Sequence, residues 1–270
     1  MSAAFGSSVA QVLTMCPPSV LTNHTTVVTV VINNSNYCRE RSRPDGRSRP
    51  LTTTQGGVRN MKLVVFGSTG MGGSAAVAAG LERGHDVTVL ARSQASADKA
   101  PPGVRVVRGD ALDPAAVART LDGADAVIQY LGVGGLGDGK PNDFVPDATR
   151  VIIEEMRAHR IERLVCASNM GLPGSGAFLF RRVLVPLFAR RLPPILDAKV
   201  VMEARLADSE LAWTAVRLPA LKAGAAKGTV KVDPTGRATG YAITCADAAD
   251  FMLDSIEQRR HLRTAVGVSN

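Results

Sequence analysis

The strongest constraint on the fold is the stretch between Lys62 and Gly73, K-L-V-V-F-G-S-T-G-M-G-G, in which a short apolar run enters a glycine-rich turn. A continuous run of branched apolar residues is typical of a strand buried on both faces of a parallel sheet. The alanine-rich segment 75–83 that follows predicts a helix. A strand, a tight turn and a helix in this order predict a βα unit that begins an α/β fold.

Two registers of glycines fit the turn. Gly67, Gly70 and Gly73 follow the strand at three-residue intervals, whereas Gly70, Gly72 and Ala75 match the pattern G-x-G-x-x-A. The second register starts three residues beyond the strand, so we predict the register that begins at the end of the strand, at Gly67.

We expect this turn to bind the pyrophosphate of a dinucleotide. Glycines permit the tight turn and let main-chain N–H groups approach a phosphate, and the N-terminus of the following helix attracts an anion. Thr69, Met71 and Gly72 complete the predicted binding turn. A tight βα turn that binds nothing is the structural alternative.

Strand-like and helix-like segments alternate along the rest of the chain. Strands are expected at 86–91, 104–107, 125–131, 164–167, 212–217, 227–232 and 265–268, and helices at 115–121, 144–159, 195–209 and 246–258. This alternation predicts an α/β, Rossmann-type doubly wound parallel sheet with helices on both faces. It forms one NAD(P)-binding domain over 61–270, in which a small C-terminal region, 172–240, contributes the substrate side.

The first 60 residues are predicted to lie outside this domain. They are rich in Ser, Thr, Asn, Arg and Pro, and they hold half of the formal net charge of +8. We expect residues 1–60 to be disordered, or not to be translated, with Met61 as the true start; an organellar transit peptide is the alternative. The remaining charge suits a phosphate-bearing cofactor as well as DNA, and no nucleic-acid motif accompanies it.

Cysteine usage and hydropathy exclude several classes. The four cysteines show no C-x-x-C pair and no histidine cluster, so we expect reduced thiols, a cytoplasmic location and no metal site. Cys166 lies in an apolar strand and is expected to be a small core residue. An apolar helix expected at 178–191 is too short to cross a bilayer, and a lid or substrate-side role is favoured over a membrane-surface role.

Residues at the ends of later strands extend the cofactor prediction. Arg92 lies 19 residues beyond Gly73, where an acid selects NAD and an arginine pairs with the 2′-phosphate of NADP, so NADP (NADPH) is expected. Asp110 is placed near the adenine, and Gly132 lies where the backbone passes the nicotinamide. Each of these residues follows a strand at its carboxyl end, the edge where open α/β sheets bind ligands.

Together these motifs resemble the atypical short-chain dehydrogenase/reductases. The motifs are G-S-T-G-M-G-G, V-L-A-R, G-D-A-L-D-P, A-V-I-Q-Y-L-G, C-A-S and S-E-L-A-W-T-A-V-R-L-P. The chain is most similar to the NAD(P)H-binding group that includes flavin reductase/biliverdin IXβ reductase and NmrA-like proteins. The resemblance implies a pyrophosphate turn at Gly67, Thr69, Gly70 and Gly73, a 2′-phosphate contact at Arg92, adenine contacts at Asp110 and Ala111, a nicotinamide-side loop at Leu131 and Gly132, and a serine near the nicotinamide at Ser168.

Two departures from the family bear on the reaction. No Tyr-x-x-x-Lys pair is present, and Ala220 and Leu221 follow Pro219 where the biliverdin reductase branch has a histidine. Flavins and quinones need little help with protonation, so we expect a reductase that passes hydride to such a small conjugated acceptor, with Ser168 as the catalytic residue that orients or polarises the acceptor by a hydrogen bond.

Other functions and residues have simpler interpretations. The alternative function is a non-catalytic NADP-sensing NmrA-like regulator with a protein partner, and a weaker third is binding of DNA or a membrane through the basic tail. No integral membrane segment is expected. Lys199 and Glu203, four residues apart on a helix, are expected to form a surface ion pair, and a pair that faces the pocket is the alternative; His85 and His159 are expected to be solvated.

Overall fold

The computed structural model describes residues 60–132, 140–141, 143–176 and 192–270, which lie within one compact unit. The N-terminal segment up to residue 59 and the helix expected at 178–191 therefore lie outside the described residues, and both remain predictions.

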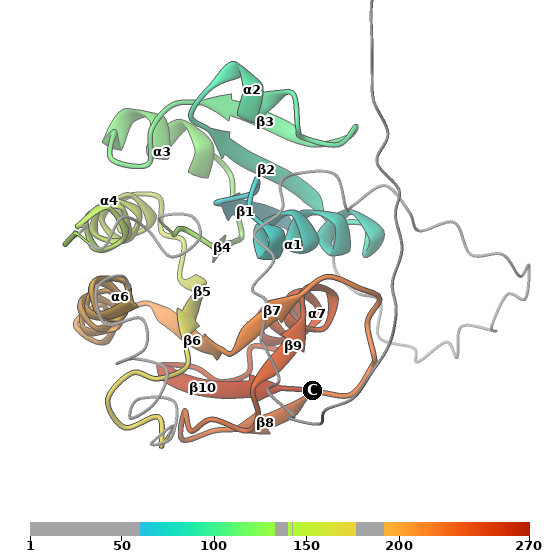
Figure 1. Ribbon diagram of the computed structural model, residues 1–270. Coiled ribbons are helices and arrows are strands. Elements are labelled where there is room, and N and C mark those ends of the chain that lie inside the picture. Colours follow the sequence, from blue (N-terminus) through green and yellow to red (C-terminus); the bar gives the residue numbers. More distant parts are fainter. Residues whose placement is uncertain (1–59, 133–139, 142, 177–191) are drawn as a thin grey trace, which may run out of the picture. The chain divides into compact units, whose positions relative to one another are not determined.

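An eight-stranded sheet forms the centre of the domain (Figure 1), in the order β3-β2-β1-β4-β5-β6-β10-β8. All its neighbouring strands pair in parallel except β10 and β8, which are antiparallel. The strands are β1 (Lys62–Phe66), β2 (Asp86–Ala91), β3 (Arg105–Arg108), β4 (Ala126–Gln129), β5 (Arg163–Asn169), β6 (Ala212–Leu218), β8 (Lys231–Asp233) and β10 (Thr264–Ser269). The strand order changes direction at β1, which has β2 on one side and β4 on the other. Doubly wound sheets bind ligands at such a switch point.

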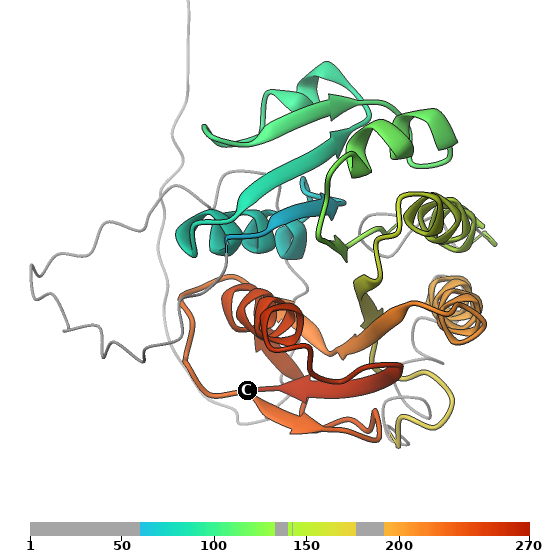
Figure 2. The same ribbon diagram turned by 180° about the vertical axis from the view of Figure 1, so that it is seen from behind.

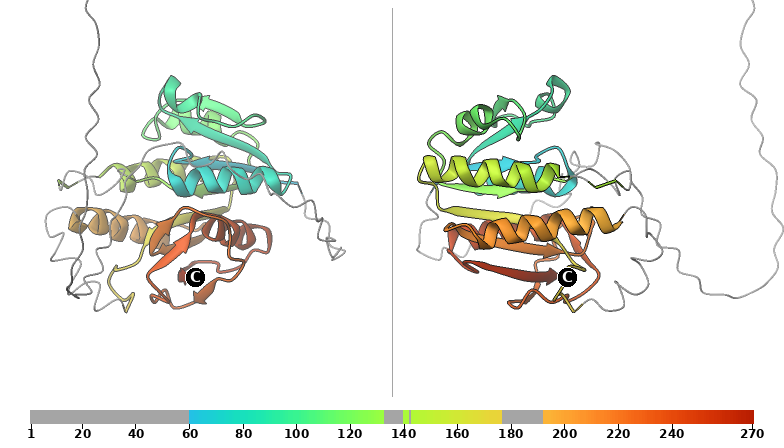
Figure 3. Two further views of the ribbon diagram at one scale, coloured as in Figure 1. Left: turned by 45° about the vertical axis from the view of Figure 1, so that its right-hand side comes forward. Right: turned by 90° about the vertical axis from the view of Figure 1, so that its left-hand side faces the viewer.

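Helices cover both faces of the sheet, as Figure 1 and the view from behind in Figure 2 show. α1 and α7 pack together on one face, and α3, α4 and α6 lie on the other, where α4 and α6 run side by side (Figure 3). The helices are α1 (Met71–Glu82), α2 (Gln94–Ala97), α3 (Pro114–Leu121), α4 (Phe144–Ala158), α6 (Leu192–Ala207) and α7 (Cys245–Glu257). The predicted Rossmann-type fold is thus confirmed.

The hydrophobic core consists of two clusters, one on each face of the sheet. In β1, Leu63 and Val65 point toward the α1 and α7 side, while Val64 and Phe66 pack on the other side. This burial of alternate residues on both faces explains why β1 reads as an unbroken apolar run. Asp113 caps α3 as expected, because its carboxylate accepts a hydrogen bond from Ala115 N at 3.0 Å and Pro114 opens the first turn.

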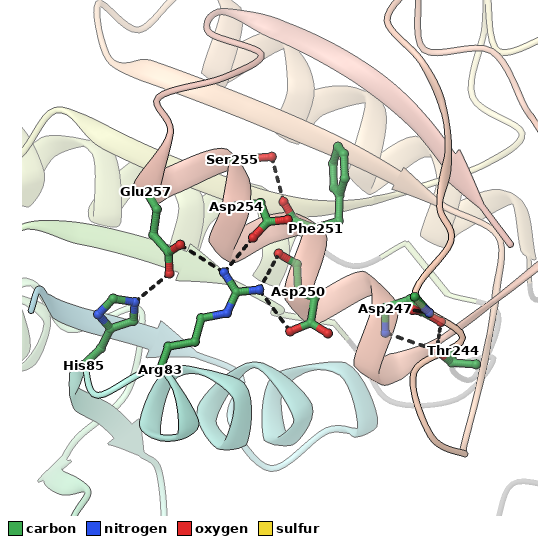
Figure 4. A network of polar contacts seen from close by, with 10 residues as sticks. Arg83, His85, Thr244, Asp247, Asp250, Phe251, Asp254, Ser255 and Glu257 are labelled. Carbon is green, nitrogen blue, oxygen red and sulfur yellow. Dashed lines mark hydrogen bonds and ion pairs between the residues drawn. The ribbon is translucent and has the colours of Figure 1, made fainter. Parts of the chain in front are cut away.

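A charged network joins α1 to α7 (Figure 4). The Arg83 guanidinium contacts Asp254 at 2.6 Å, and Asp250 and Glu257 at 3.1 Å each. Glu257 also accepts a hydrogen bond from His85 Nε2 at 2.8 Å, because Met61 N donates to the other ring nitrogen. The expectation of a solvated His85 is wrong, since this side chain is fully buried; His159 is exposed, as expected.

The region after β6 differs most from the sequence prediction. A second, two-stranded parallel sheet pairs β7 (Ala220–Lys222) with β9 (Ala242–Thr244), and it was not expected. The strand expected at 227–232 is wrong in its first half. The N–H groups of Lys227 and Gly228 each donate to the Asp247 carboxylate at 2.9 Å, so these residues form a loop pinned to the start of α7. Only the end of the expected segment joins a strand, as the antiparallel edge β8.

Candidate functional site

The glycine turn requires glycine at its first position. Gly67 directly follows β1 and has φ of +79°, a left-handed conformation that side chains disfavour. A Cβ atom there would lie 2.6 Å from the carbonyl oxygen of Tyr130, beyond the end of the neighbouring strand β4. The turn therefore begins at the strand end and at the switch point of the sheet.

Two glycines in the first turn of α1 are needed for close packing. A Cβ on Gly73 would lie 2.1 Å from the carbonyl oxygen of Gly67, and one on Gly72 would lie 2.3 Å from the Tyr130 ring. Gly70 has a negative φ, and a Cβ on it would meet only the Gly67 oxygen at 3.6 Å. The steric demand thus falls on Gly67, Gly72 and Gly73, and within the register that begins at Gly67 it falls on the first and last glycines.

The start of α1 fits a phosphate group. Gly70 is the N-cap and offers no capping side chain, and the first turn of the helix carries no acidic residue. Thr69, Gly70 and Met71 are exposed, and Gly70 N donates to the carbonyl oxygen of Gly67 at 3.2 Å, which leaves the N–H groups of the first helical turn without a partner inside the helix. Such a helix N-terminus is a ready anion site, and the described residues therefore fit the pyrophosphate of a dinucleotide.

The ends of β2 and β3 place the next predicted residues side by side. The register pairs Ala91 with Arg108, so Arg92 and the Gly109–Asp110 turn follow neighbouring strands. Arg92 is exposed. One Asp110 oxygen accepts a hydrogen bond from Leu112 N at 2.9 Å, and Ala111 is buried in the core. A free guanidinium at this edge fits a second phosphate beside the turn.

The ends of β4 and β5 bring Leu131 beside Ser168. Gln129 pairs with Cys166 at the end of β4, and the Lys199 ammonium contacts the carbonyl oxygens of both Leu131 and Ala167, so Leu131 lies near the residue that precedes Ser168. Leu131 packs partly against the core, and Gly132 is exposed with open space around its α-carbon. The predicted nicotinamide-side loop and the predicted catalytic serine therefore lie at adjacent points of the same edge.

Ser168, Glu203 and Arg217 form one cluster, called here the Ser168 cluster. The Ser168 hydroxyl donates to Glu203 Oε1 at 2.5 Å. The Arg217 guanidinium donates through Nη2 to Glu203 Oε2 at 2.7 Å and through Nε to Oε1 at 3.1 Å. All three side chains are largely buried, and they come from β5, α6 and β6. Arg217 is a residue of this site that the sequence analysis missed; its only signal was a charge inside an otherwise apolar strand.

Lys199 lies one turn before Glu203 on α6 and also points inward. Its ammonium donates to the carbonyl oxygens of Ala167 at 2.7 Å and Leu131 at 3.1 Å. Burial lowers the pKa of Lys199 to about 8, against the opposing effect of Cys166 and Glu203. The expected surface pair between Lys199 and Glu203 is wrong, because both side chains are largely buried beneath the helix and contact other groups, Lys199 two carbonyl oxygens and Glu203 the Ser168 hydroxyl and Arg217.

Two further buried groups line this part of the sheet. Cys166 lies in the core as expected, and burial raises the pKa of its thiol to about 12, so it is not a reactive thiolate at neutral pH. The Tyr130 hydroxyl is buried without a hydrogen-bond partner among the described residues, and burial raises its pKa. Its ring fills the space over Gly72, which explains the glycine there.

Neither a metal site nor a membrane span emerges from the part of the chain that the structure describes. Within those residues, no group of three or more His, Cys, Asp or Glu side chains is arranged to hold a metal ion. The described helices also include none whose length and hydropathy would let it cross a bilayer.

Comparison with known proteins supports a dinucleotide-binding assignment. Residues 67–259 match a protein family described as NAD(P)H-binding. Among curated proteins, a UDP-glucose 4-epimerase of Corynebacterium glutamicum is 32% identical over 120 residues, which is 42% of this chain and 36% of that protein. A 3-diazoavenalumate denitrifying reductase of Streptomyces sp is 36% identical over 117 residues, or 40% of this chain and 38% of that protein. The chain thus spans well under half the length of these relatives.

Solved structures show the same fold over most of the chain. ChuY, an anaerobillin reductase from Escherichia coli O157:H7, superposes with a TM-score of 0.63 at 22% identity, covering 77% of this chain and 96% of that one. A short-chain dehydrogenase/reductase from Veillonella parvula in complex with NADP gives a TM-score of 0.65 at 17% identity, covering 78% and 95%. At these identities the likeness concerns the fold alone.

Proposed function

The chain belongs to the NAD(P)H-binding family, and we propose that it is an NADPH-dependent reductase that passes hydride to a small conjugated acceptor such as a flavin or a quinone. The observation that carries the proposal is the open N-terminus of α1 beside a sterically obligatory Gly67, next to an exposed Arg92 at the adjacent strand end. Relatives named reductases support the class of reaction.

The choice of NADP over NAD rests on Arg92. An acid at the end of β2 would accept a hydrogen bond from the ribose 2′-hydroxyl, whereas a guanidinium pairs with a 2′-phosphate through two parallel hydrogen bonds. The Ser93 and Ser96 hydroxyls lie 3.1 Å apart, so one donates to the other and only one serine proton remains for the same phosphate. Arg92 is therefore the residue to which we assign the selectivity.

Bound NADPH would supply the hydride, and the chain's own residues would place the reactants. The glycine turn would hold the pyrophosphate, and Lys199 would fix the strand ends at Leu131 and Ala167, where the acceptor approaches. Orientation of this kind can contribute several kcal/mol to catalysis, roughly 7–11 at most. We assign the proton to solvent, since the Lys199 ammonium is already engaged by two carbonyl oxygens.

A second candidate function is a non-catalytic NADP sensor with a protein partner. The absence of a Tyr-x-x-x-Lys pair from the sequence favours it, because such a chain lacks the usual proton-donating couple. The sensor would use the same glycine turn and Arg92. A cytoplasmic location is proposed for either function.

One experiment separates the two functions. NADPH binding is followed by its fluorescence, and NADPH oxidation is followed at 340 nm with a panel of flavins and quinones. A reductase binds NADPH and oxidises it with at least one acceptor. Tight NADPH binding without turnover on any acceptor contradicts the reductase and favours the sensor, and the absence of NADPH binding contradicts both.

A further inference from the structure

The single proton of the Ser168 hydroxyl is already committed. A serine hydroxyl has one O–H donor and lone pairs that accept. In this site the hydroxyl lies 2.5 Å from Glu203 Oε1, a short contact of the kind formed between a hydroxyl and a carboxylate. The proton therefore points toward α6.

Glu203 cannot be the donor in this contact. Arg217 approaches both of its oxygens, with Nη2 at 2.7 Å from Oε2 and Nε at 3.1 Å from Oε1. Guanidinium groups only donate, so each carboxylate oxygen already acts as an acceptor. Arg217 is held in this orientation by a third hydrogen bond, from Nη1 to the carbonyl oxygen of Gly236 at 3.2 Å. The positive charge of Arg217, on the neighbouring strand β6, thus makes Ser168 the donor and Glu203 the acceptor of their hydrogen bond.

The remaining lone pairs of Ser168 determine what a ligand must bring. Ser168 is buried, with 3% of its surface exposed, and it lies near the carboxyl end of β5, at the edge where open α/β sheets bind their ligands. A carbonyl oxygen that faces Ser168 Oγ would set lone pairs against lone pairs, and burial would leave both acceptors unpaired. An N–H or O–H group would complete the hydrogen bonds of the serine.

We infer that the acceptor presents a hydrogen-bond donor to Ser168, so that the site selects conjugated acceptors carrying an imide N–H or a hydroxyl over bare quinones. The inference rests on the proposed function, because only a reductase has a hydride acceptor. The predicted selectivity itself concerns the binding of that ligand and not its reduction. It also reverses the expected role of Ser168, which accepts a hydrogen bond from the ligand instead of donating one to polarise it. Ser168 is then a specificity-determining residue, and Glu203 and Arg217 are positioning residues.

The test compares two flavins, one with a hydrogen-bond donor at its imide and one with a methyl group there, and the variants below separate the loss of the donor from the added bulk. Lumiflavin carries an imide N–H, and 3-methyllumiflavin has a methyl group in its place. Binding to the full chain, saturated with NADP, is measured by quenching of flavin fluorescence. We expect lumiflavin to bind about 5- to 10-fold more tightly, the effect of one buried hydrogen bond. Equal binding, or tighter binding of the methylated flavin, overturns the inference.

Substitution of Glu203 by glutamine tests the direction of the hydrogen bond. The amide of Glu203→Gln can donate to Ser168 Oγ, which frees the serine proton for the ligand. The preference for lumiflavin is then lost or inverted in Glu203→Gln. The matched control is Glu154→Gln, which removes the same charge from an exposed pair with Arg150 and keeps the preference of the unaltered chain. A preference that persists unchanged in Glu203→Gln overturns the inference.

A second variant covers the case in which Glu203→Gln fails to fold. Ser168→Ala removes the acceptor with a small change in volume, and it should bind the two flavins equally while its thermal unfolding remains cooperative. A measurement of NADPH oxidation then distinguishes a failure of this inference from a failure of the proposed function. Selective binding without NADPH oxidation contradicts the reductase and leaves the inference standing, whereas turnover with equal binding contradicts the inference and leaves the reductase.

Discussion

The candidate site has two parts along the carboxyl edge of the sheet, one at the ends of β1, β2 and β3 and one at the ends of β5 and β6, and the two parts are built by different kinds of contact. Around Gly67 the site consists of main-chain atoms, and its shape requires glycines, because a Cβ atom at these positions would clash with neighbouring atoms. Around Ser168 it consists of buried charged and polar side chains from three separate elements. The first part is determined by close main-chain packing, of Gly73 on Gly67 and of Gly67 on Tyr130, and the second by hydrogen bonds between buried side chains. The two parts should therefore respond differently to substitution.

The Ser168 cluster should show the largest effect. Arg217→Met leaves the Glu203 carboxylate largely buried and without its partner, and we expect the free energy of unfolding to fall by roughly 3–4 kcal/mol. The double variant Arg217→Met/Glu203→Leu should lose less than the sum of the two single variants, since no uncompensated charge is left. Urea denaturation measures all three, and additive losses would show that the pair is effectively solvated.

In the glycine turn, even the methyl group of an alanine should lower the free energy of unfolding. Gly73→Ala places a methyl group against the main chain of Gly67, and we expect a loss of roughly 2–3 kcal/mol in the free energy of unfolding. Gly70→Ala is the matched control, because its methyl group meets only an oxygen at ordinary contact distance, and its stability should change by less than about 0.5 kcal/mol. Equal losses in urea denaturation would contradict the steric account.

The buried Lys199 should make stability depend on alkaline pH. Its pKa of about 8 in the folded chain lies below the ordinary value of 10.5, so the unfolded chain binds more protons between these values. The free energy of unfolding contributed by Lys199 therefore rises with pH in this window, by roughly 2 kcal/mol between about pH 8 and 9.5. Below about pH 8 both states are charged, and the cost of burial is fully present.

The contribution of Lys199 is isolated by difference. Urea denaturation of the unaltered chain and of Lys199→Met is compared at several pH values, since other groups titrate equally in both. The difference in unfolding free energy should change across the window and be constant below it. A difference that does not vary with pH would contradict the burial of a charged ammonium.

Arg92 should affect cofactor choice more than stability. Arg92→Glu replaces a phosphate partner by an acid suited to a ribose hydroxyl, and we expect the preference for NADPH over NADH to fall about 20-fold. The ratio of dissociation constants for the two cofactors measures it. Arg105→Glu, an exposed arginine at the start of β3, should leave the ratio unchanged. An unchanged ratio in Arg92→Glu would mean that the 2′-phosphate is bound elsewhere.

The smallest effect is expected away from both parts of the site, in the network between α1 and α7 (Figure 4). Arg83 contacts three carboxylates and is largely covered, so Arg83→Ala should cost roughly 1 kcal/mol, and less at high salt. Arg150→Ala removes an exposed pair on α4 and should cost about 0.3 kcal/mol. Equal melting temperatures of the two variants would show that the network adds nothing.

Elements specified by neighbouring residues lie where the sequence predicts them, whereas elements specified by distant contacts do not. The strand 86–91 matches β2 at both ends, and Asp113-Pro114 begins α3 as expected, because these signals lie within a few neighbouring residues. The small β7–β9 sheet was missed, since its strands are three residues long and separated by a loop that Asp247 holds. Short strands carry too few residues for a periodic pattern to appear.

Sequence patterns were sufficient to predict the fold class, the place of the glycine turn and the residues at each strand end, because hydrophobic periodicity and turn signals involve residues close together in the chain. The tertiary structure alone decided that Lys199 and Glu203 turn inward and that Arg217 joins them. These side chains meet groups 14 to 68 residues away in the chain. The stability of a buried charge depends on which partners surround it, and no local pattern records those partners.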